Sequence, residues 1–366
     1  MPSGLTTKHL GRIGNVNTYK DKKILVTGHT GFKGAWLTVM LQSLGAEVFG
    51  LSKDIGQKRP EVKADLAKEN EFDVDIRDRS SLSKVIKNVN PDLVFHLAAQ
   101  SLVLESYRDP LNTFEINFGG TLNILDICST LASLSGVVIT TTDKVYKNTD
   151  LDRRFKEDDE LGGSDPYSAS KSSVSILIKS WREIPTFKRM QFVDVRAGNV
   201  IGGGDRALNR LMPDLIQGAI SKQPIVIRNP ESVRPWQHVL DPLVGYLKVG
   251  QSILQEKKLK PSYNFGPLSQ NPVRVQDLAQ IFLKHFPDLS VSYARSVNEE
   301  KESKLLQLDS NLALTEFGWF SQISTEDAIN MTILWEKAVQ YGELRSLEAT
   351  KGQILQMLEL KDFNCG

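Results

Sequence analysis

Residues 23–45 decide the fold that this chain is expected to adopt; their sequence is KILVTGHTGFKGAWLTVMLQSLG. A β-rich run is followed by glycines at positions 28, 31 and 34, and then by an amphipathic stretch that ends at Gly45. This order predicts a buried strand, a tight turn and a helix closed by glycine. Glycines in such a turn bring backbone N–H groups close to a pyrophosphate, which the helix N-terminus also attracts. The stretch therefore predicts dinucleotide binding, although the glycines by themselves would also suit a purely structural turn.

Strand and helix patterns alternate up to about residue 200. Further strands are expected at 46–51, 71–76, 92–99, 136–141 and 192–198, with helical stretches such as 110–132 and 166–183 between most of them. The alternation implies crossover connections, so the fold class is α/β with a Rossmann-type doubly wound parallel sheet. Later in the chain Pro and Gly become frequent, which favours a smaller mixed α/β C-terminal lobe. The expected division is an N-terminal arm (1–22), a Rossmann domain (23–200, rejoined by 239–266) and a lobe (201–238 and 267–366).

The composition excludes several classes of protein. The 366 residues are 40% hydrophobic and 24% charged with a net charge of +1, and no basic block points to nucleic acid or an anionic membrane as a partner. Two cysteines, Cys128 and Cys365, cannot form a disulfide framework, and Cys128 is expected to be a buried free thiol in a reducing compartment. Without an apolar run of about 18 residues or a signal-sequence pattern, a cytoplasmic location is expected. The five scattered histidines, including His96 and His238, predict no metal site.

Two short motifs carry candidate acid–base chemistry. In DPYSASK, residues 165–171, Asp165 and Pro166 start a helix, so Tyr167 and Lys171 share one face. An ammonium beside a phenol lowers the pKa of the phenol, which makes Tyr167 a candidate base near neutral pH. The other motif, Thr142, Asp143 and Lys144, stands at the end of the strand over 136–141. Such a triplet alone is most often a solvated turn.

The choice of dinucleotide depends on the end of the second strand, whose sequence GLSKD has no acid directly at its tip. Ser52 or Asp54 could bind the adenosine ribose, whereas Lys53 could attract a 2′-phosphate. Of these alternatives, NAD is the cofactor expected. Asp75 and Ile76, at the end of the third strand, are placed to meet the adenine edge, although their spacing alone would suit a charged strand end equally well.

Together these motifs resemble the extended short-chain dehydrogenase/reductases, also described as the NAD-dependent epimerase/dehydratase family. The glycine loop, the Asp75-Ile76 pair, LAA at 97–99 and the Tyr-xxx-Lys pair follow one another in the family's order over residues 22–340. Segments such as VTGHTGFKGAWL, TDKVY, RAGNVIGGGD and IRNPESVRPWQH are similar to the branch of nucleotide-sugar 4,6-dehydratases that acts on CDP-glucose. The resemblance implies that NAD is held by Gly28, Thr30, Gly31, Phe32, Lys33, Gly34, Ser52, Asp75, Ile76, Leu97, Ala98, Ala99, Tyr167 and Lys171.

The resemblance also implies a mechanism and partners. Tyr167, helped by Lys171 and Thr142, would remove the 4-hydroxyl proton while carbon 4 of the sugar gives hydride to NAD. Lys144 would take the proton from carbon 5, Asp143 would protonate the departing 6-hydroxyl, and the hydride would return to carbon 6, giving CDP-4-keto-6-deoxyglucose. A homodimer that forms through the helices over 110–132 and 166–183 is expected. The enzyme is also expected to take part in deoxysugar synthesis for the lipopolysaccharide O-antigen. The C-terminal lobe would bind the nucleotide sugar, whose contacts are expected from Gln100, Ser101, Asn199, Arg210 and Arg234.

The chain departs from that branch at three places. Ser101 and Leu104 stand where a proline and an arginine are expected, Arg206 stands where a tryptophan is expected, and the stretch TDLDRRFKEDDE after the acid–base motif is charged throughout. All three places are expected near the sugar or the entrance to its site. The alternative is therefore a dehydratase or 4-epimerase of a different nucleotide-linked sugar. Trp319 and Trp335 are expected to be core residues.

Overall fold

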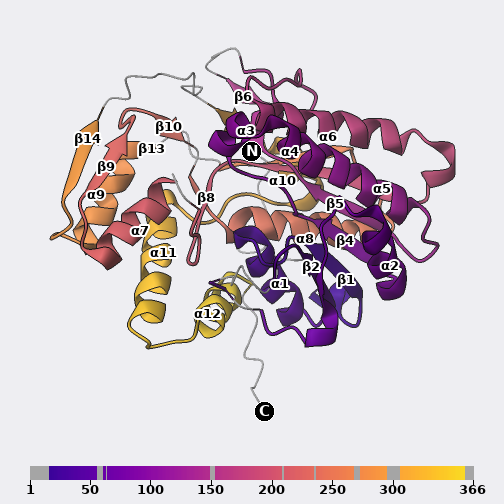
Figure 1. The fold of residues 1–366 in the computed structure, drawn as a ribbon, viewed down its shortest axis with the longest axis horizontal. Coiled ribbons are helices and arrows are strands. Elements are labelled where there is room, and N and C mark those ends of the chain that lie inside the picture. The colour runs from indigo at the N-terminus through magenta and orange to yellow at the C-terminus, as the bar shows by residue number, and fades with distance from the viewer. Residues whose placement is uncertain are drawn as a thin grey trace, which may run out of the picture.

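A seven-stranded parallel sheet forms the centre of the molecule (Figure 1). The computed structural model describes residues 16–55, 61–62, 64–148, 153–207, 210–234, 236–267, 273–294 and 306–358. The strand order is β12-β7-β5-β4-β1-β2-β3, which changes direction between β1 and β4, the place where open α/β sheets bind ligands. The strands are β1 (Lys23–Thr27), β2 (Glu47–Ser52), β3 (Glu71–Asp73), β4 (Leu93–His96), β5 (Gly136–Thr140), β7 (Gln191–Ala197) and β12 (Ser262–Phe265).

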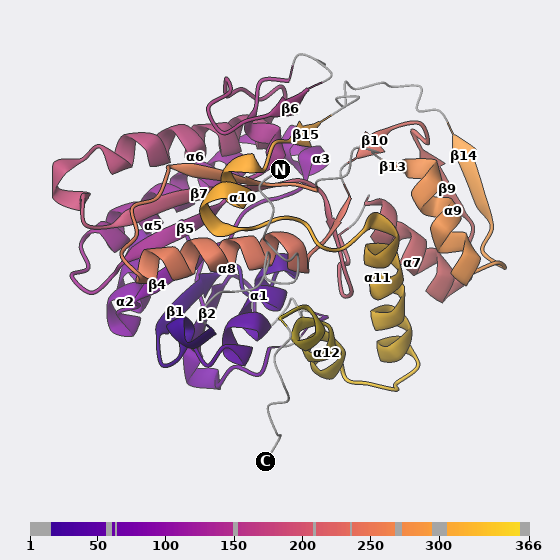
Figure 2. The ribbon, with the colours of Figure 1, turned by 180° about the vertical axis from the view of Figure 1, so that it is seen from behind.

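Helices cover both faces of this sheet because neighbouring residues of each strand point to opposite sides. Ile24 and Val26 belong to one apolar layer together with Trp36, whereas Leu25 belongs to the other together with Ile178. Figures 1 and 2 show the two faces in turn. The predicted doubly wound α/β fold is confirmed. The first layer is made by α1 (Phe32–Ser43) and α8 (Leu240–Leu254), and the second by α2 (Arg79–Val89), α5 (Thr121–Ser129) and α6 (Pro166–Arg182).

The helical stretch predicted over 110–132 is divided. It begins as α4 (Pro110–Phe114), continues as a π-helical turn over Glu115–Gly120 and ends with α5. Asn117 in that turn accepts a hydrogen bond from the Gln100 backbone N–H at 2.8 Å and donates to the Gln100 carbonyl at 3.0 Å. The irregular turn therefore holds the chain that leaves β4. A short helix that the sequence pattern did not predict, α3 (Val103–Arg108), precedes α4.

The second lobe packs around its own apolar core, which includes Leu215, Ile227, Leu278 and Ile333. Figure 2 shows it beside the carboxyl ends of the central strands. Strand β9 pairs in parallel with β14, and β10 pairs antiparallel with β13. Its elements are α7 (Leu211–Ser221), β9 (Ile225–Arg228), β10 (Val233–Arg234), β13 (Val273–Arg274), α9 (Val275–His285), β14 (Val291–Ala294) and α11 (Thr325–Gln340).

Several later elements return to the first part of the chain. Helix α10 contacts β12 and α8, and α12 contacts α1. Part of the segment 267–366 thus lies against the layers of the Rossmann sheet, and the division into domains given above remains a prediction. These elements are α10 (Asn311–Phe317) and α12 (Ser346–Leu358), and the short pairs are β6 (Arg154–Phe155) with β15 (Gln307–Leu308) and β8 (Val200–Ile201) with β11 (Gln237–His238).

Single residues confirm part of the expected interior. Cys128 is a buried free thiol, whereas Cys365 and residues 1–15 of the expected arm lie outside the described residues. Trp319 and Trp335 are both 1% exposed, as expected for core residues. Among the described residues no helix combines the length and the apolar character needed to span a membrane.

Candidate active site

A large cavity opens at the carboxyl ends of the central strands. Its volume of about 1780 Å³ exceeds the 300–1,000 Å³ typical of a site for one small molecule, so it has room for a cofactor and a substrate together. Strand ends from both halves of the sheet and residues of the second lobe line it. Of the predicted site residues, the structure brings together here Gly28, Thr30, Gly31, Phe32, Lys33, Gly34, Ser52, Asp75, Ile76, Leu97, Ala98, Ala99, Gln100, Ser101, Thr142, Asp143, Lys144, Tyr167, Lys171, Asn199 and Arg210.

The glycine turn between β1 and α1 has no space for side chains at two positions. Gly28 has a φ of +74°, and a Cβ there would lie 2.7 Å from the backbone nitrogen of Ala98. A Cβ at Gly34 would lie 2.0 Å from the Gly28 carbonyl oxygen. Helix α1 follows Gly31 without a side-chain cap, so the N–H groups of its first turn are available to a phosphate. This backbone cradle fits the pyrophosphate of a dinucleotide.

The adenosine end of the cradle is built by the ends of β2 and β3. The Ser52 hydroxyl is hydrogen-bonded to His29 Nδ1 at 3.0 Å, and it accepts a hydrogen bond from the Thr30 backbone N–H at 3.3 Å. The Lys53 ammonium, which could have attracted a 2′-phosphate, lies 3.3 Å from Asp75. Hydrogen bonds from Arg77 lower the pKa of the Asp75 carboxyl to about 2. Because Lys53 already has an anionic partner, this end suits NAD better than its 2′-phosphorylated form.

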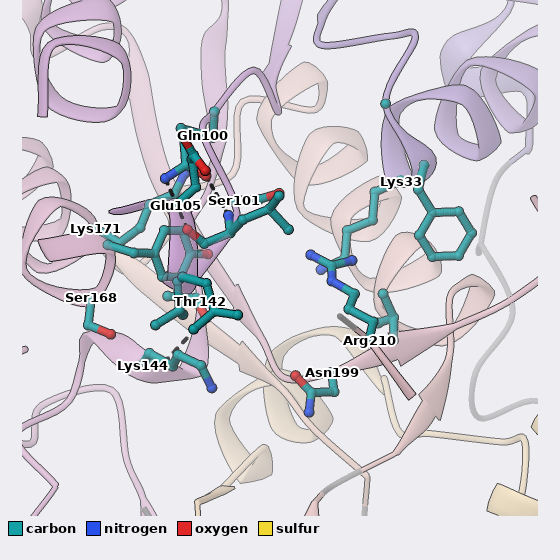
Figure 3. A pocket seen from close by; sticks show the side chains of 18 of the residues that line it. Lys33, Gln100, Ser101, Glu105, Thr142, Lys144, Ser168, Lys171, Asn199 and Arg210 are labelled. Atoms are coloured by element: carbon teal, nitrogen blue, oxygen red, sulfur yellow. Dashed lines mark hydrogen bonds between the residues drawn. The ribbon is translucent and has the colours of Figure 1, made fainter. Parts of the chain in front are cut away.

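The acid–base motif forms a tight turn at the end of β5. The Thr142 hydroxyl donates to Asp143 Oδ1 at 2.9 Å and accepts from the Lys144 backbone N–H at 3.3 Å. Asp143 is 2% exposed and Thr142 is buried, while Lys144 is half-buried. A solvated turn would expose all three side chains. All three residues of this turn instead line the cavity, and Figure 3 shows Thr142 and Lys144 there.

Helix α6 supplies the second pair of groups to the same cavity. Asp165 caps the helix by accepting from the Ser168 backbone N–H at 2.9 Å, as the sequence predicted. Tyr167 and Lys171 consequently lie on the buried face, at 8% and 6% exposure. The Lys171 ammonium donates to the Thr140 carbonyl at 3.0 Å. That hydrogen bond ties the helix to the strand that carries the acid–base turn.

The pKa of the Tyr167 phenol differs from the expectation. Burial raises it to about 12, and the hydrogen bond to the Thr142 hydroxyl and the positive charge of Arg210 offset this only in part. The expected lowering by Lys171 is therefore wrong for the ligand-free chain. Burial likewise lowers the pKa of the Lys171 ammonium to about 8, although the Asp194 carboxylate opposes this. Loss of solvation thus outweighs the attraction between charges at both groups.

The opposite wall of the cavity is cationic. Figure 3 shows Lys33 and Arg210 on the side facing Thr142 and Lys144, with Asn199 below them. Burial, followed by the nearby charge of Arg210, lowers the pKa of the Lys33 ammonium to about 8. Arg210 also lies 3.3 Å from the Asp205 carboxylate.

The remaining predicted substrate residues differ in their surroundings. The Gln100 side-chain amide donates to Leu102 O and Thr113 Oγ1, both at 3.0 Å, and accepts from Leu102 N at 2.5 Å. Its side chain therefore shapes the loop, whereas Ser101 is exposed. Arg234 lies on β10, and the role predicted for its side chain lies outside what the structure describes.

The departures from the resembling branch fall in different environments. Leu104 lines the cavity and is 43% exposed. Arg206 is not among the residues that line it and instead makes two hydrogen bonds of 2.7 Å to the Glu336 carboxylate on α11. Arg206 therefore does not form part of the cavity wall, and the expectation that it lies near the sugar or the entrance to its site stays a prediction. Within the charged stretch, residues 149–152 lie outside the described residues.

Several lining residues were not predicted, among them Glu105 on α3 and Trp236 next to β11. The Trp236 indole N–H is buried and has no hydrogen-bond partner among the described residues. Its motif RPWQH was noted in the sequence, but only the arginine was predicted to contact substrate.

Neither His96 nor His238 belongs to a metal-binding cluster, because the described residues contain no group of His, Cys, Asp and Glu able to hold an ion.

Comparison with known proteins agrees with this geometry. Residues 24–266 match the NAD dependent epimerase/dehydratase family. The chain belongs to this family. The CDP-glucose 4,6-dehydratase of Salmonella typhimurium is 35% identical over 340 residues, which cover 89% of this chain and 94% of that protein. The UDP-glucose 4-epimerase of Haemophilus influenzae is 26% identical over 86% of this chain and 97% of its own length.

Solved structures share the fold. An epimerase from Methanothermobacter thermautotrophicus superposes with a TM-score of 0.78 at 23% identity, over 89% of this chain and 95% of its own. A dTDP-glucose 4,6-dehydratase from Bacillus anthracis, in complex with NAD, superposes with a TM-score of 0.73 at 20% identity, over 87% and 98% of the two chains. The family depends on NAD, and the glycine cradle described above fits that cofactor.

Proposed function

We propose that this chain is a NAD-dependent CDP-glucose 4,6-dehydratase. The observation that carries the proposal is the buried acid–base turn, Asp143 beside Lys144, in one cavity with Tyr167 and Lys171. Oxidation of a sugar hydroxyl needs only the tyrosine and lysine, whereas elimination of water needs a further base and acid on adjacent carbons. The 35% identity to a CDP-glucose 4,6-dehydratase supports both the reaction and the nucleotide.

In the first step, Tyr167 takes the proton of the sugar's 4-hydroxyl. NAD held by the glycine turn of Gly28, Gly31 and Gly34 would supply the acceptor for the hydride of carbon 4 and the source of the hydride for carbon 6. A phenol whose pKa stands at about 12 is a poor base at neutral pH, so occupation of the cavity must lower that pKa before Tyr167 can act. Thr142, which interacts with the phenol, the positive charge of Arg210 and the ammonium of Lys171 on the same helix face are groups able to stabilise the phenolate.

In the second step, Lys144 acts on the neighbouring carbon. The 4-keto group acidifies the proton on carbon 5, and neutral Lys144 removes it. Protonated Asp143 gives its proton to the 6-hydroxyl, which leaves as water. After the hydride has returned to carbon 6, Lys144 gives a proton back to carbon 5, so the sugar loses one water in total. The Thr142 hydroxyl, which bonds Asp143 at 2.9 Å, orients the acid.

Arg210 and Asn199 are proposed to bind the substrate diphosphate, since a guanidinium forms paired hydrogen bonds to phosphate oxygens. A homodimer is also proposed, because Leu111 and Ile176 leave apolar surface 69% and 58% exposed on α4 and α6. The cytoplasmic location and the place in O-antigen deoxysugar synthesis belong to this proposal; the composition supports the first and the resemblance supports the second.

The decisive experiment uses CDP-glucose deuterated at carbon 4, with and without added NAD. We expect a product that is lighter by one water, that carries the deuterium at carbon 6 and that shows the alkali-induced absorbance of a 4-keto-6-deoxy sugar. Lys144→Ala should lose this product while still binding NAD, whereas Lys84→Ala, at an exposed lysine on α2 that does not line the cavity, serves as the matched control. Product from another nucleotide-linked hexose but not from CDP-glucose would show that the enzyme is a dehydratase of that other sugar. Deuterium returned to carbon 4 would indicate an epimerase. No product from any nucleotide sugar would contradict the proposal.

A further inference from the structure

A buried ion pair lies behind the catalytic strand end and outside the wall of the cavity. Asp194 and Arg196, on β7, are 1% and 0% exposed, and Arg196 Nε donates to Asp194 Oδ2 at 2.8 Å. Neither residue is among those that line the cavity. Removing two charges from water costs several kcal/mol per ion, and apolar residues of the same volume usually serve stability as well or better. Stability alone therefore does not account for this pair.

The Asp194 carboxylate connects both elements that carry the catalytic groups. One of its oxygens accepts a hydrogen bond from the Thr141 hydroxyl, and the other accepts from the Ser175 hydroxyl at 2.7 Å. Thr141 immediately precedes the acid–base turn. Ser175 lies four residues after Lys171, on the same face of α6. A single buried carboxylate thus fixes the turn relative to the helix.

Arg196 holds the other end of the same turn. Its Nη1 donates to the Tyr146 hydroxyl at 2.7 Å, and its guanidinium lies 5.0 Å from the centre of the Tyr146 ring. The Tyr146 hydroxyl in turn donates to Asn264 Oδ1 on β12 at 2.7 Å. Thr141 and Tyr146 flank the turn from either side, so the ion pair clamps both of its ends.

Asp194 also acts on the charge of Lys171. The same ammonium donates to the Thr140 carbonyl, and its charge acts on His96 on β4 and on Lys33 on α1, while Tyr167 and Asp143 line the same cavity. His96 is held neutral by burial, which lowers its pKa to about 3, and Lys33 brings a charge of the same sign. The carboxylate that favours the charged form of Lys171 is that of Asp194.

We propose that Asp194 is a positioning residue of the dehydratase: with Arg196 as its partner, it holds the acid–base turn in register with α6 and keeps Lys171 charged during turnover. The inference rests on the proposed function. It extends the catalytic machinery to a residue that touches neither cofactor nor substrate.

The test compares Asp194→Asn, which keeps the shape and removes the charge, with two other variants. Asp126→Asn, at an exposed ion pair with Arg79, is the matched control for the same chemical change. Ser175→Ala removes one hydrogen bond from α6 and leaves the charge of Asp194 in place. We expect Asp194→Asn to move the alkaline limb of the pH profile of kcat to lower pH, because it removes the carboxylate that favours the charged form of Lys171. Ser175→Ala is expected to lower kcat without moving the limb, and Asp126→Asn to change neither.

A second readout does not depend on activity. Lysine labelled with ¹³C at Cε reports the titration of Lys171 by NMR in the ligand-free protein, with its signal assigned by its loss in Lys171→Arg. The midpoint is expected to fall in Asp194→Asn and to stay in Asp126→Asn. An unchanged midpoint overturns the inference, even if the wild-type protein is inactive and the proposed function itself has failed. An active wild type with the same pH limb in Asp194→Asn also overturns it.

If Asp194→Asn does not fold, Thr141→Val tests the same clamp from the turn. We expect a loss of about tenfold or more in kcat with unchanged NAD affinity, since small misplacements of reacting groups have effects of this size. An unchanged kcat in a folded Thr141→Val variant overturns the proposal.

Discussion

Replacing Lys171 by methionine should stabilise the folded protein while abolishing its activity. Lys171 is 6% exposed, and burial lowers the pKa of its ammonium to about 8 from the ordinary 10.5. A difference of this size corresponds to about 3 kcal/mol of destabilisation wherever the group is charged in both the folded and the unfolded chain. Methionine has a similar length and carries no charge. The lost hydrogen bond to the Thr140 carbonyl offsets about 1 kcal/mol, which leaves about 2 kcal/mol of net stabilisation at pH 7.

The stability difference between Lys171→Met and the wild type should depend on pH in one direction. Between pH 8 and 10.5 the lysine is neutral in the folded chain and charged in the unfolded chain, so the unfolded chain binds more protons and the wild-type protein gains stability as the pH rises. The advantage of the Lys171→Met variant should therefore shrink steadily from pH 8 towards pH 10. Other buried lysines, such as Lys248, titrate alike in both proteins and cancel in the comparison.

The assay is urea unfolding of the wild type, Lys171→Met and Lys84→Met at pH 7, 8.5 and 10. Lys84 is exposed on α2, and its replacement should change the free energy of unfolding by no more than about 0.5 kcal/mol at any pH. A Lys171→Met variant less stable than wild type at pH 7, or a difference that does not change with pH, would refute the reasoning.

Three further outcomes follow from the structure. Gly34→Ala should abolish NAD binding measured by calorimetry, because its Cβ would lie 2.0 Å from the Gly28 carbonyl oxygen; unchanged binding would contradict the cradle. Arg206→Ala should lower the free energy of unfolding by about 2 kcal/mol or more, because the carboxylate of Glu336, 4% exposed, loses its cationic partner. The KM for CDP-glucose should stay unchanged, and a raised KM would place Arg206 in the substrate site. Lys144→Ala should still oxidise carbon 4, so NADH absorbance at 340 nm should accumulate in a single turnover, and an absence of NADH would place this lysine in the first step.

Much of this site could be predicted because its signals are local. Gly28 and Gly34 are required by contacts within one turn and the adjoining strand end, and the helix start at Asp165 and Pro166 sets Tyr167 on its buried face through helical spacing alone. Parallel pairing then brings the strand ends to one edge of the sheet. Except for the close approach of Gly28 to Ala98, these features depend on residues close together in the chain, so the sequence pattern was sufficient to predict them.

The protonation chemistry and the supporting contacts were decided by tertiary structure. The pKa of Tyr167 rises because the assembled layers remove water from the phenol, and the helical spacing to Lys171 contains no information about that loss. Arg206 finds Glu336 130 positions away, and the Asp194 carboxylate joins Thr141 and Ser175 from a third element. The sequence by itself thus determined which backbone turns and helix faces form, because those depend on short-range geometry. Burial and long-range pairing decided the charge states, because they exist only once distant segments have packed together.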